Sequence, residues 1–155
     1  MITPRIQKKS EYEERVIEIR RVSRVMKGGK RMSFRATVVV GNRAGKVGVG
    51  IAKGLDVAAS IDKAKRQAIK NIIVLNLKEG RTISYDIDAK YCAARIRMKP
   101  ASKGHGLIAG GSARIVLELA GVKDISSKIL GRTTNKLTNA LAAIEGLKMS
   151  QILKK

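Results

Sequence analysis

The sequence predicts an α+β fold made of two units, in each of which strands come before a helix. Two runs with a two-residue apolar period, 34–40 and 47–51, flank a short loop and precede a stretch of helical period that begins at Val57. A second set of alternating runs and helical stretches follows the polar turn 78–81. Strands grouped ahead of helices in this way are typical of α+β domains.

Length and charge narrow the class of protein. A chain of 155 residues with 44% hydrophobic residues can form one ordinary domain or two small ones with a real core. Lys and Arg number 33 against 12 Asp and Glu, which gives a net charge of +21 spread along the whole chain. Such self-repulsion is rare unless the working partner is a polyanion, so the charge favours nucleic acid.

Several other classes are disfavoured by composition. No apolar run approaches the ~20 residues of a membrane span, and the N-terminus lacks the apolar core of a signal peptide, so we expect a soluble intracellular protein. The single cysteine, Cys92, excludes an internal disulfide and is expected to be buried or half-buried. With one Phe, three Tyr and no Trp, recognition through phosphates, helix shape and loops is favoured over base stacking.

The first unit is expected to span residues 15–78, after a polar arm at 1–14 that orders only on a partner. A first strand starts at Arg15 and ends at a flexible basic loop around Gly28 and Gly29. Two half-buried strands joined by residues 41–45 follow. These elements give three strands ahead of the helix.

The helix of the first unit is predicted from Asp56, a suitable N-cap, with apolar residues recurring three and four apart as far as Leu75. Its opposite face carries Lys63, Arg66 and Lys70. A stripe of this kind is commonly just solvated, but the overall charge favours contact with RNA. Three strands and a helix form a layer that double-stranded-RNA-binding domains also use.

The second unit, residues 79–148, is expected to have the order ββαβα, with a short tail at 149–155. Its strands are predicted at 83–87 and 94–98, the second with one basic face formed by Arg95, Arg97 and Lys99. A Gly-rich loop over 100–113 leads into a helix with Ser112 as N-cap and Gly121 as terminator. After a mixed strand and loop, a last helix is expected from about Thr134 to Ile144, capped by Thr133 or Thr134.

Sites for catalysis or metal binding are not indicated. The stretch from Gly41 to Lys46 has three residues where a P-loop needs four, and a strand follows it. The glycines before Ala113 could bind a phosphate at the helix N-terminus, a layout similar to the phosphate loop of kinases such as galactokinase and homoserine kinase. The acidic residues are scattered, however, and form no magnesium site. His105, the only histidine, is interpreted as a hydrogen-bonding loop residue, and no cofactor is expected.

Two long stretches resemble a known family. The runs GGKRMSFRATVVVGNRAGKVGVGIAKG and MKPASKGHGLIAGGSARIVLELAGVKDISSKILGRTTN are similar to the small-subunit ribosomal protein S5 family, bacterial type. The resemblance covers about Val16 to Leu147. It implies an N-terminal double-stranded-RNA-binding-like domain and a C-terminal domain with a left-handed βαβ crossover, which is a fold shared with those kinases.

The resemblance also implies a function. A member of this family is a structural constituent of the small ribosomal subunit, not an enzyme. It binds small-subunit ribosomal RNA, supports assembly, touches ribosomal proteins S4 and S8, lines the messenger RNA entry path and influences translational accuracy. We therefore expect a cytoplasmic protein in the small subunit, from a bacterium or an organelle. Two alternatives stay open: a free double-stranded-RNA-binding regulator and a small-molecule kinase.

The resemblance also gives expected site residues. The stretch with Arg20, Arg21, Ser23 and Arg24, and the loop with Lys27, Gly28, Gly29, Lys30 and Arg31, are similar to the family's flexible RNA-facing loop near the decoding region. Arg43, Lys46 and Lys53 are expected to face RNA around the end of the hairpin. Contact with S4 is expected at Lys103, Gly104, Gly106 and Arg114. In many relatives the tail after Leu147 is longer.

Overall fold

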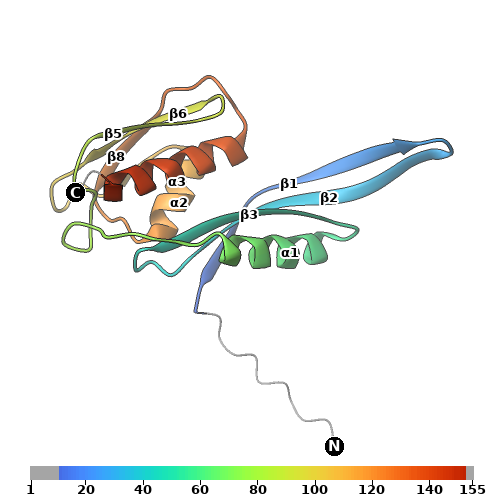
Figure 1. Ribbon diagram of the computed structural model, residues 1–155, viewed down its shortest axis with the longest axis horizontal. Helices are drawn as coiled ribbons and strands as arrows, with labels where there is room; N and C mark the ends of the chain where they lie inside the picture. Colours follow the sequence, from blue (N-terminus) through green and yellow to red (C-terminus); the bar gives the residue numbers. More distant parts are fainter. Residues whose placement is uncertain (1–10, 153–155) are drawn as a thin grey trace, which may run out of the picture.

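The chain folds into four stacked layers. The computed structural model describes residues 11–152. From top to bottom in Figure 1 these layers are the C-terminal sheet, helices α2 and α3, the N-terminal sheet and helix α1. The expected α+β fold with two units is confirmed, and the two units pack directly on each other.

The N-terminal unit is an antiparallel sheet of four strands with one helix. Its elements are β1 (Glu13–Met26), β2 (Gly29–Gly41), β3 (Lys46–Gly54), α1 (Val57–Lys70) and β4 (Ile73–Val74), and the strand order follows the sequence. β1 starts within the segment expected as an arm, of which residues 1–10 lie outside the described chain. The short β4 replaces the last helical turn that was predicted, because three β-branched residues in succession, Ile72 to Val74, favour extended backbone.

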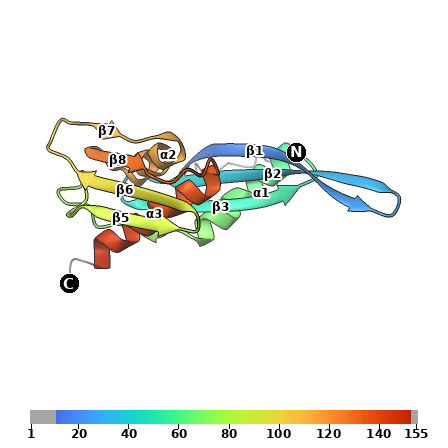
Figure 2. The same ribbon diagram turned by 90° about the horizontal axis from the view of Figure 1, so that it is seen from above.

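β1 and β2 form one long two-stranded ribbon. They pair continuously apart from a bulge after Val16, and Met26 lies opposite Gly29. The expected flexible loop over Lys27 to Arg31 is therefore wrong, because only Lys27 and Gly28 turn the chain and residues 29–31 belong to β2. Figures 1 and 2 show the ribbon extending well beyond the rest of the molecule. Arginines and lysines expected on a loop are thus fixed on a projecting strand pair.

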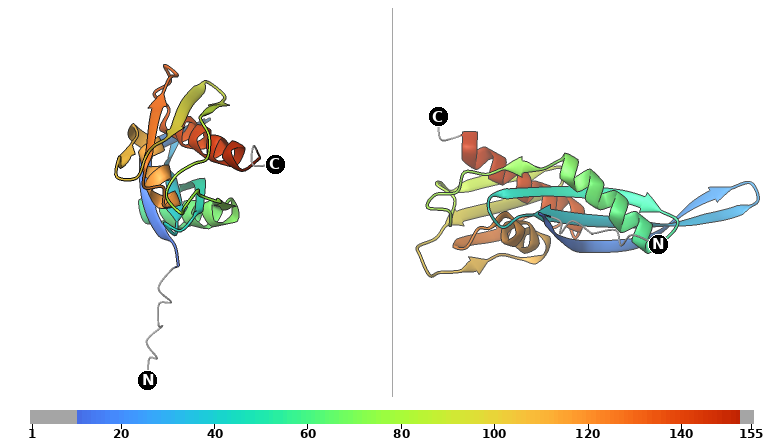
Figure 3. Two further views of the ribbon diagram at one scale, coloured as in Figure 1. Left: turned by 90° about the vertical axis from the view of Figure 1, so that its left-hand side faces the viewer. Right: turned by 90° about the horizontal axis from the view of Figure 1, so that it is seen from below.

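The inner strands of this sheet are buried on both faces. Ala36, Val38 and Val40 pack toward α1, whereas Val39 joins the core beneath the C-terminal unit. The prediction of half-buried strands was wrong here, since Val39 is as completely buried as its neighbours. α1 lies on the other side of the sheet from the C-terminal unit, as the view from below in Figure 3 shows.

The Val-Gly-Val-Gly pattern of β3 has a packing explanation. Val47 and Val49 face the C-terminal unit and are buried. A Cβ atom at Gly48 or Gly50 would lie only 2.4 or 2.2 Å from a backbone carbonyl oxygen of α1. These glycines therefore let the helix lie directly on the strand. Packing explains the glycine pattern without a phosphate-binding role.

The C-terminal unit is a mixed sheet covered by two helices. Its elements are β5 (Ile87–Tyr91), β6 (Ala94–Pro100), β7 (Leu107–Ile108), α2 (Gly111–Ala120), β8 (Ile125–Ile129) and α3 (Lys136–Ile152). The spatial order is β5-β6-β8-β7, with β7 parallel to β8. In Figure 2 the sheet lies in front of α2, and the β7-α2-β8 connection is the left-handed crossover implied by the family resemblance.

Three details of this unit differ from the prediction. The first strand starts at Ile87 and not at Ile83, because a tight turn at Cys92 and Ala93 fixes its pairing with β6. Cys92 is exposed and has a φ of 51°, so the expectation that it is buried was wrong. β7 is a short strand within the predicted Gly-rich loop.

The helix ends follow capping rules, although some caps differ from the expected residues. Asp56 caps α1 by accepting a 2.7 Å hydrogen bond from the Val57 N–H, and Gly121 ends α2 with a φ of 85°, as predicted. Ser112 lies inside α2, which starts after Gly110 without a side-chain cap. The predicted threonine caps of α3 are wrong, since Asn135 accepts a 3.1 Å hydrogen bond from the Leu137 N–H. α3 itself continues to Ile152, into the segment expected to be a tail.

A single large core joins the two units. It combines β3 and the Val39 side of β2 with α2, α3 and the inner face of the C-terminal sheet. A smaller cluster fills the space between the N-terminal sheet and α1. No helix within residues 11–152 combines the length and hydropathy required to cross a membrane. The position of the ribbon is thus set by the core shared by both units.

Candidate nucleic-acid interface

The strand pairing places five cations on one face of the ribbon and the adjoining sheet. Arg20 lies opposite Arg35 and Arg24 lies opposite Arg31, while Lys53 of β3 lies opposite Arg35 on its other side. Paired residues share a face, and so do residues two or four apart along a strand. We call this set, Arg20, Arg24, Arg31, Arg35 and Lys53, the ribbon face.

Like charges directly opposite each other destabilise a sheet. Among the residues that the structure describes, Arg20 is the one member of the ribbon face with a carboxylate partner, and its Nε lies 2.9 Å from Oε2 of Glu18. Within residues 11–152, no ion pair reaches Arg24, Arg31 or Lys53. An approaching polyanion would relieve this repulsion, which is the physical reason for regarding the ribbon face as a phosphate-binding surface.

An open groove of about 640 Å³ lies where the ribbon meets the segment between β3 and α1. Arg24, Arg31 and Lys53 supply its cations, and Ser23 and Ser33 supply hydroxyl groups. Hydroxyls and cations together can hold phosphate and ribose oxygens. Leu55, which is 87% exposed, borders the groove and offers an apolar contact.

The remaining ribbon residues lie at the tip or on the other face. Arg21 and Lys30 have the opposite parity from Arg24, so their side chains start from the reverse side of the ribbon. Lys27 and Gly28 form the tip, where a Cβ atom on Gly28 would contact nothing within 4 Å. RNA could therefore approach the tip closely from more than one side.

The cations of α1 form a separate surface. Lys63, Arg66 and Lys70 are exposed on this helix, which lies on the opposite side of the sheet from the ribbon face. Lys65, on the same helix, is 2.9 Å from a carboxylate oxygen of Glu14. A role for the helix stripe in RNA binding stays a prediction.

The structure separates Arg43 and Lys46 from Lys53, with which they were expected to act. They lie at opposite ends of β3, and only Lys53 borders the ribbon groove. Arg43 is 2.9 Å from Glu13 and 3.7 Å from Glu118, and Lys46 is 3.8 Å from Glu11. Glu118 also accepts two hydrogen bonds from Arg15. These ion pairs tie β1, the β2-β3 loop and α2 together.

The loop expected to contact a protein partner is held by a residue that was not predicted. Asp124 is 2% exposed and accepts hydrogen bonds of 3.1 and 3.0 Å from the N–H groups of Gly104 and Gly106. Both glycines have positive φ, 92° and 81°, which favours glycine. Arg81 donates a 2.8 Å hydrogen bond to the same carboxylate and, together with the Gly106 N–H, lowers the pKa of Asp124.

Asp124 thus fixes the shape of this loop, on which Lys103 and Gly104 are exposed, as is Arg114 in the first turn of α2. In the sequence Asp124 was counted among scattered acids, and only its buried position reveals its role. His105 is an exposed residue of the same loop. In the part of the chain that the structure describes, no three His, Cys, Asp or Glu residues gather as a metal site would require.

Comparisons with known proteins agree with these observations. The family models for the ribosomal protein S5 N-terminal domain and the ribosomal protein S5 C-terminal domain match residues 12–76 and 89–154. The small ribosomal subunit protein uS5 of Campylobacter jejuni is 49% identical over 141 residues, covering 91% of this chain and 95% of the relative. That of Thermosynechococcus vestitus is 46% identical over 143 residues, covering 92% and 82% of the two chains.

A uS5c protein from Emiliania huxleyi is 48% identical over 137 residues, covering 88% of this chain and 86% of the relative. The two family models together cover most of the chain and coincide with its two structural units. The chain therefore belongs to the ribosomal protein S5 family of the small ribosomal subunit.

Proposed function

We propose that the chain binds small-subunit ribosomal RNA through the ribbon face as a structural constituent of the subunit. The observation that carries the proposal is the opposed pair Arg24 and Arg31, which has no carboxylate partner within residues 11–152. The neighbouring opposed pair, Arg20 and Arg35, has one carboxylate partner, Glu18. Cations held this close to one another are stabilised when phosphates replace the missing carboxylates.

The mechanism is positional rather than catalytic. Each phosphate contact releases counterions, so binding weakens as salt rises. The ribbon is joined to the shared core through β2, whose residues 36–41 are buried. The cations therefore keep a fixed spacing and present themselves without ordering a flexible loop, which lowers the entropic cost of binding.

Contact with ribosomal protein S4 is proposed at Lys103, Gly104, Gly106 and Arg114, on the loop that Asp124 holds and on the first turn of α2. Contact with S8, a place along the messenger RNA entry path, support of assembly and an influence on translational accuracy rest on the family resemblance. A fixed loop shape is what a contact that influences accuracy would require, because a small displacement would then change the interface.

The family membership makes a kinase activity unnecessary to explain the fold. A free double-stranded-RNA-binding regulator is distinguished by selectivity. We expect a small-subunit ribosomal RNA transcript to bind in the presence of excess generic RNA duplex, because a shaped ribbon and groove should recognise folded RNA beyond its charge. Equal competition by the generic duplex would favour the regulator instead.

A further inference from the structure

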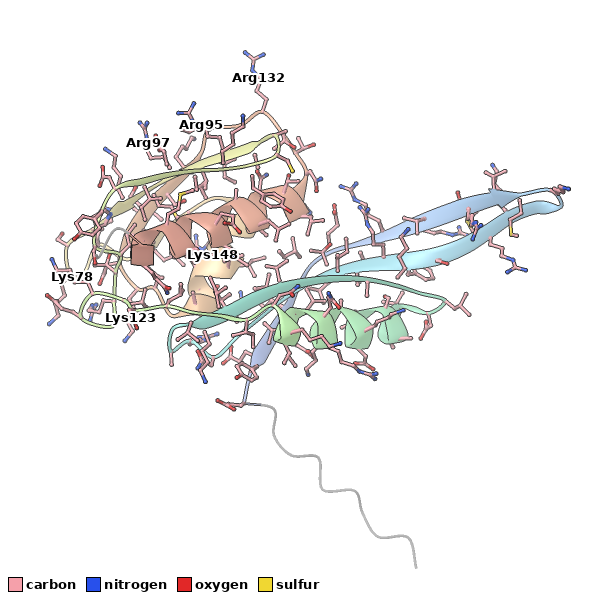
Figure 4. All side chains as sticks on the ribbon, in the orientation of Figure 1. Lys78, Arg95, Arg97, Lys123, Arg132 and Lys148 are labelled. Carbon is pink, nitrogen blue, oxygen red and sulfur yellow. The ribbon has the colours of Figure 1, made fainter. Side chains whose placement is uncertain are left out.

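The outer face of the C-terminal sheet carries a second group of cations. α2 and α3 cover the inner face, so alternate residues of β5, β6 and β8 point outward. Figure 4 shows Arg95, Arg97 and Arg132 directed away from the body of the protein on this side. We call this group, Lys90, Arg95, Arg97, Lys99, Lys128 and Arg132, the outer sheet face.

Two carboxylates neutralise this group only in part. Arg97 donates hydrogen bonds of 2.7 and 2.6 Å to the two carboxylate oxygens of Asp88, and these contacts lower the pKa of Asp88. Asp86 lies 3.6 Å from Lys99, and Arg95 is 3.9 Å from Asp88. Among the described residues, Lys90, Lys128 and Arg132 have no ion-pair partner.

The register opposes like charges here as well. Lys90 lies opposite Arg95 across β5 and β6, and Arg97 lies opposite Lys128 across β6 and β8. A sheet face that served only for solubility would be more stable with alternating signs at these positions. The arrangement repeats on a second surface the repulsion found on the ribbon face.

The chemistry of this face fits RNA better than protein. The outward positions of β5, β6 and β8 hold charged residues and Ser126, while the exposed apolar side chains Ile108 and Leu130 lie at its margin. Protein interfaces usually have an apolar centre that is depleted in charge. Aromatic side chains for base stacking are missing from these outward positions, so phosphates are the groups that the face can hold.

We propose that the outer sheet face is a second RNA-binding surface, which contacts phosphates of a different RNA segment from the one bound by the ribbon face. The inference rests on the proposed function, in which the chain binds small-subunit ribosomal RNA. α2 and α3 separate this face from the N-terminal sheet. The chain would then connect two RNA segments through one rigid core.

The test uses the full chain with three cations neutralised, K90Q/R95Q/K128Q. This variant keeps the Asp88 to Arg97 pair, and it removes both members of the opposed pair Lys90 and Arg95 and one member of the pair Arg97 and Lys128. It should therefore fold at least as stably. The matched control is K78Q/K123Q/K148Q, whose lysines lie away from the outer sheet face in Figure 4. Affinity for a small-subunit ribosomal RNA transcript is measured across a potassium chloride series.

If all three side chains contact phosphates, the slope of log K against log salt becomes less steep by about 2.7 in the variant. We expect the control to change it by much less. A variant equal to the control would overturn the proposal. The ribbon variant R24Q/R31Q in the same series separates the second surface from the proposed function. If R24Q/R31Q alone weakens RNA binding, the proposed function stands without the second surface. If neither R24Q/R31Q nor K90Q/R95Q/K128Q weakens binding, both proposals fail.

Cys92 offers an independent measurement. It is the only cysteine and is exposed at the turn between β5 and β6, beside the outer sheet face. An iron chelate attached to the Cys92 thiol should cleave the bound transcript near the outer sheet face. The variant G28C/C92S moves the chelate to the tip of the ribbon, and from there it should cleave different nucleotides. Lack of cleavage from Cys92 would overturn the proposal. The proposal would also be overturned if K90Q/R95Q/K128Q binds RNA normally but fails to join the small subunit, because the outer sheet face would then contact protein.

Discussion

Neutralising the pair Arg24 and Arg31 should weaken RNA binding while leaving the fold intact. These exposed arginines lie opposite each other on the ribbon and border the same groove. If each contacts one phosphate, the variant R24Q/R31Q loses about 1.8 from the slope of log K against log salt. Its deficit relative to the natural chain should then shrink about 12-fold between 50 and 200 mM salt.

The same variant should not be less stable. Removing an opposed pair of like charges relieves a repulsion of about 0.2–1 kcal/mol, so the free energy of unfolding should stay equal or rise slightly. Weaker binding together with unchanged stability would show that the arginines act on the ligand and not on the fold. Urea denaturation followed by circular dichroism measures the stability part.

The assay is fluorescence anisotropy with a labelled small-subunit ribosomal RNA transcript at several potassium chloride concentrations. K78Q/K148Q is the matched control, because it removes two cations from elsewhere on the chain. A salt slope in R24Q/R31Q that equals the control slope would refute the reasoning. The like-charge pairs would then be a solvated feature without a ligand.

Three further predictions concern the fold and the loop held by Asp124. G50A should destabilise the protein by about 1–3 kcal/mol in urea denaturation, because its Cβ would lie 2.2 Å from the Ala64 carbonyl oxygen. The control G28A, at an open position, should have little effect, and equal effects of the two variants would contradict the packing account. L119A should lower the free energy of unfolding by about 2–5 kcal/mol and leave a single unfolding transition, since Leu119 is completely buried in the core shared by both units. Two separate transitions would show that the units fold independently. The stabilising contribution of Asp124 should be complete above the ordinary carboxyl pKa of 3.8 and be lost as pH falls through its lowered folded-state pKa. The free energy of unfolding of D124N should therefore depend less on acid pH, and the amides of Gly104 and Gly106 should exchange faster. Unchanged exchange would contradict a positioning role.

The sequence predicted the elements that have several periods of alternation or helical repeat. Residues 34–40 and 47–51 formed strands and the stretch after Val57 formed a helix, because many residues contribute to each pattern. β4 and β7 were missed because a strand of two residues has no period. The burial of Val39 depended on a second unit covering the sheet, which local alternation cannot show.

The ribbon face could be predicted as a set of basic residues but not as a surface. Whether Arg24 meets Arg31 depends on the two-residue turn at Lys27 and Gly28, since a turn longer by one residue would change the register and faces. Lys53 and Arg43 do not act together because they lie at opposite ends of β3. Asp124 was missed because its partners Gly104 and Gly106 are about twenty residues away in the chain.

The central claim is that the chain is an integral RNA-bound component of the small ribosomal subunit. Sedimentation of a lysate through a density gradient at moderately high salt tests it most directly, because salt removes proteins held by loose charge attraction alone. The account predicts that the chain migrates with the small subunit in near-stoichiometric amount. Free chain at the top of the gradient, with the small subunit depleted of it, would contradict the claim.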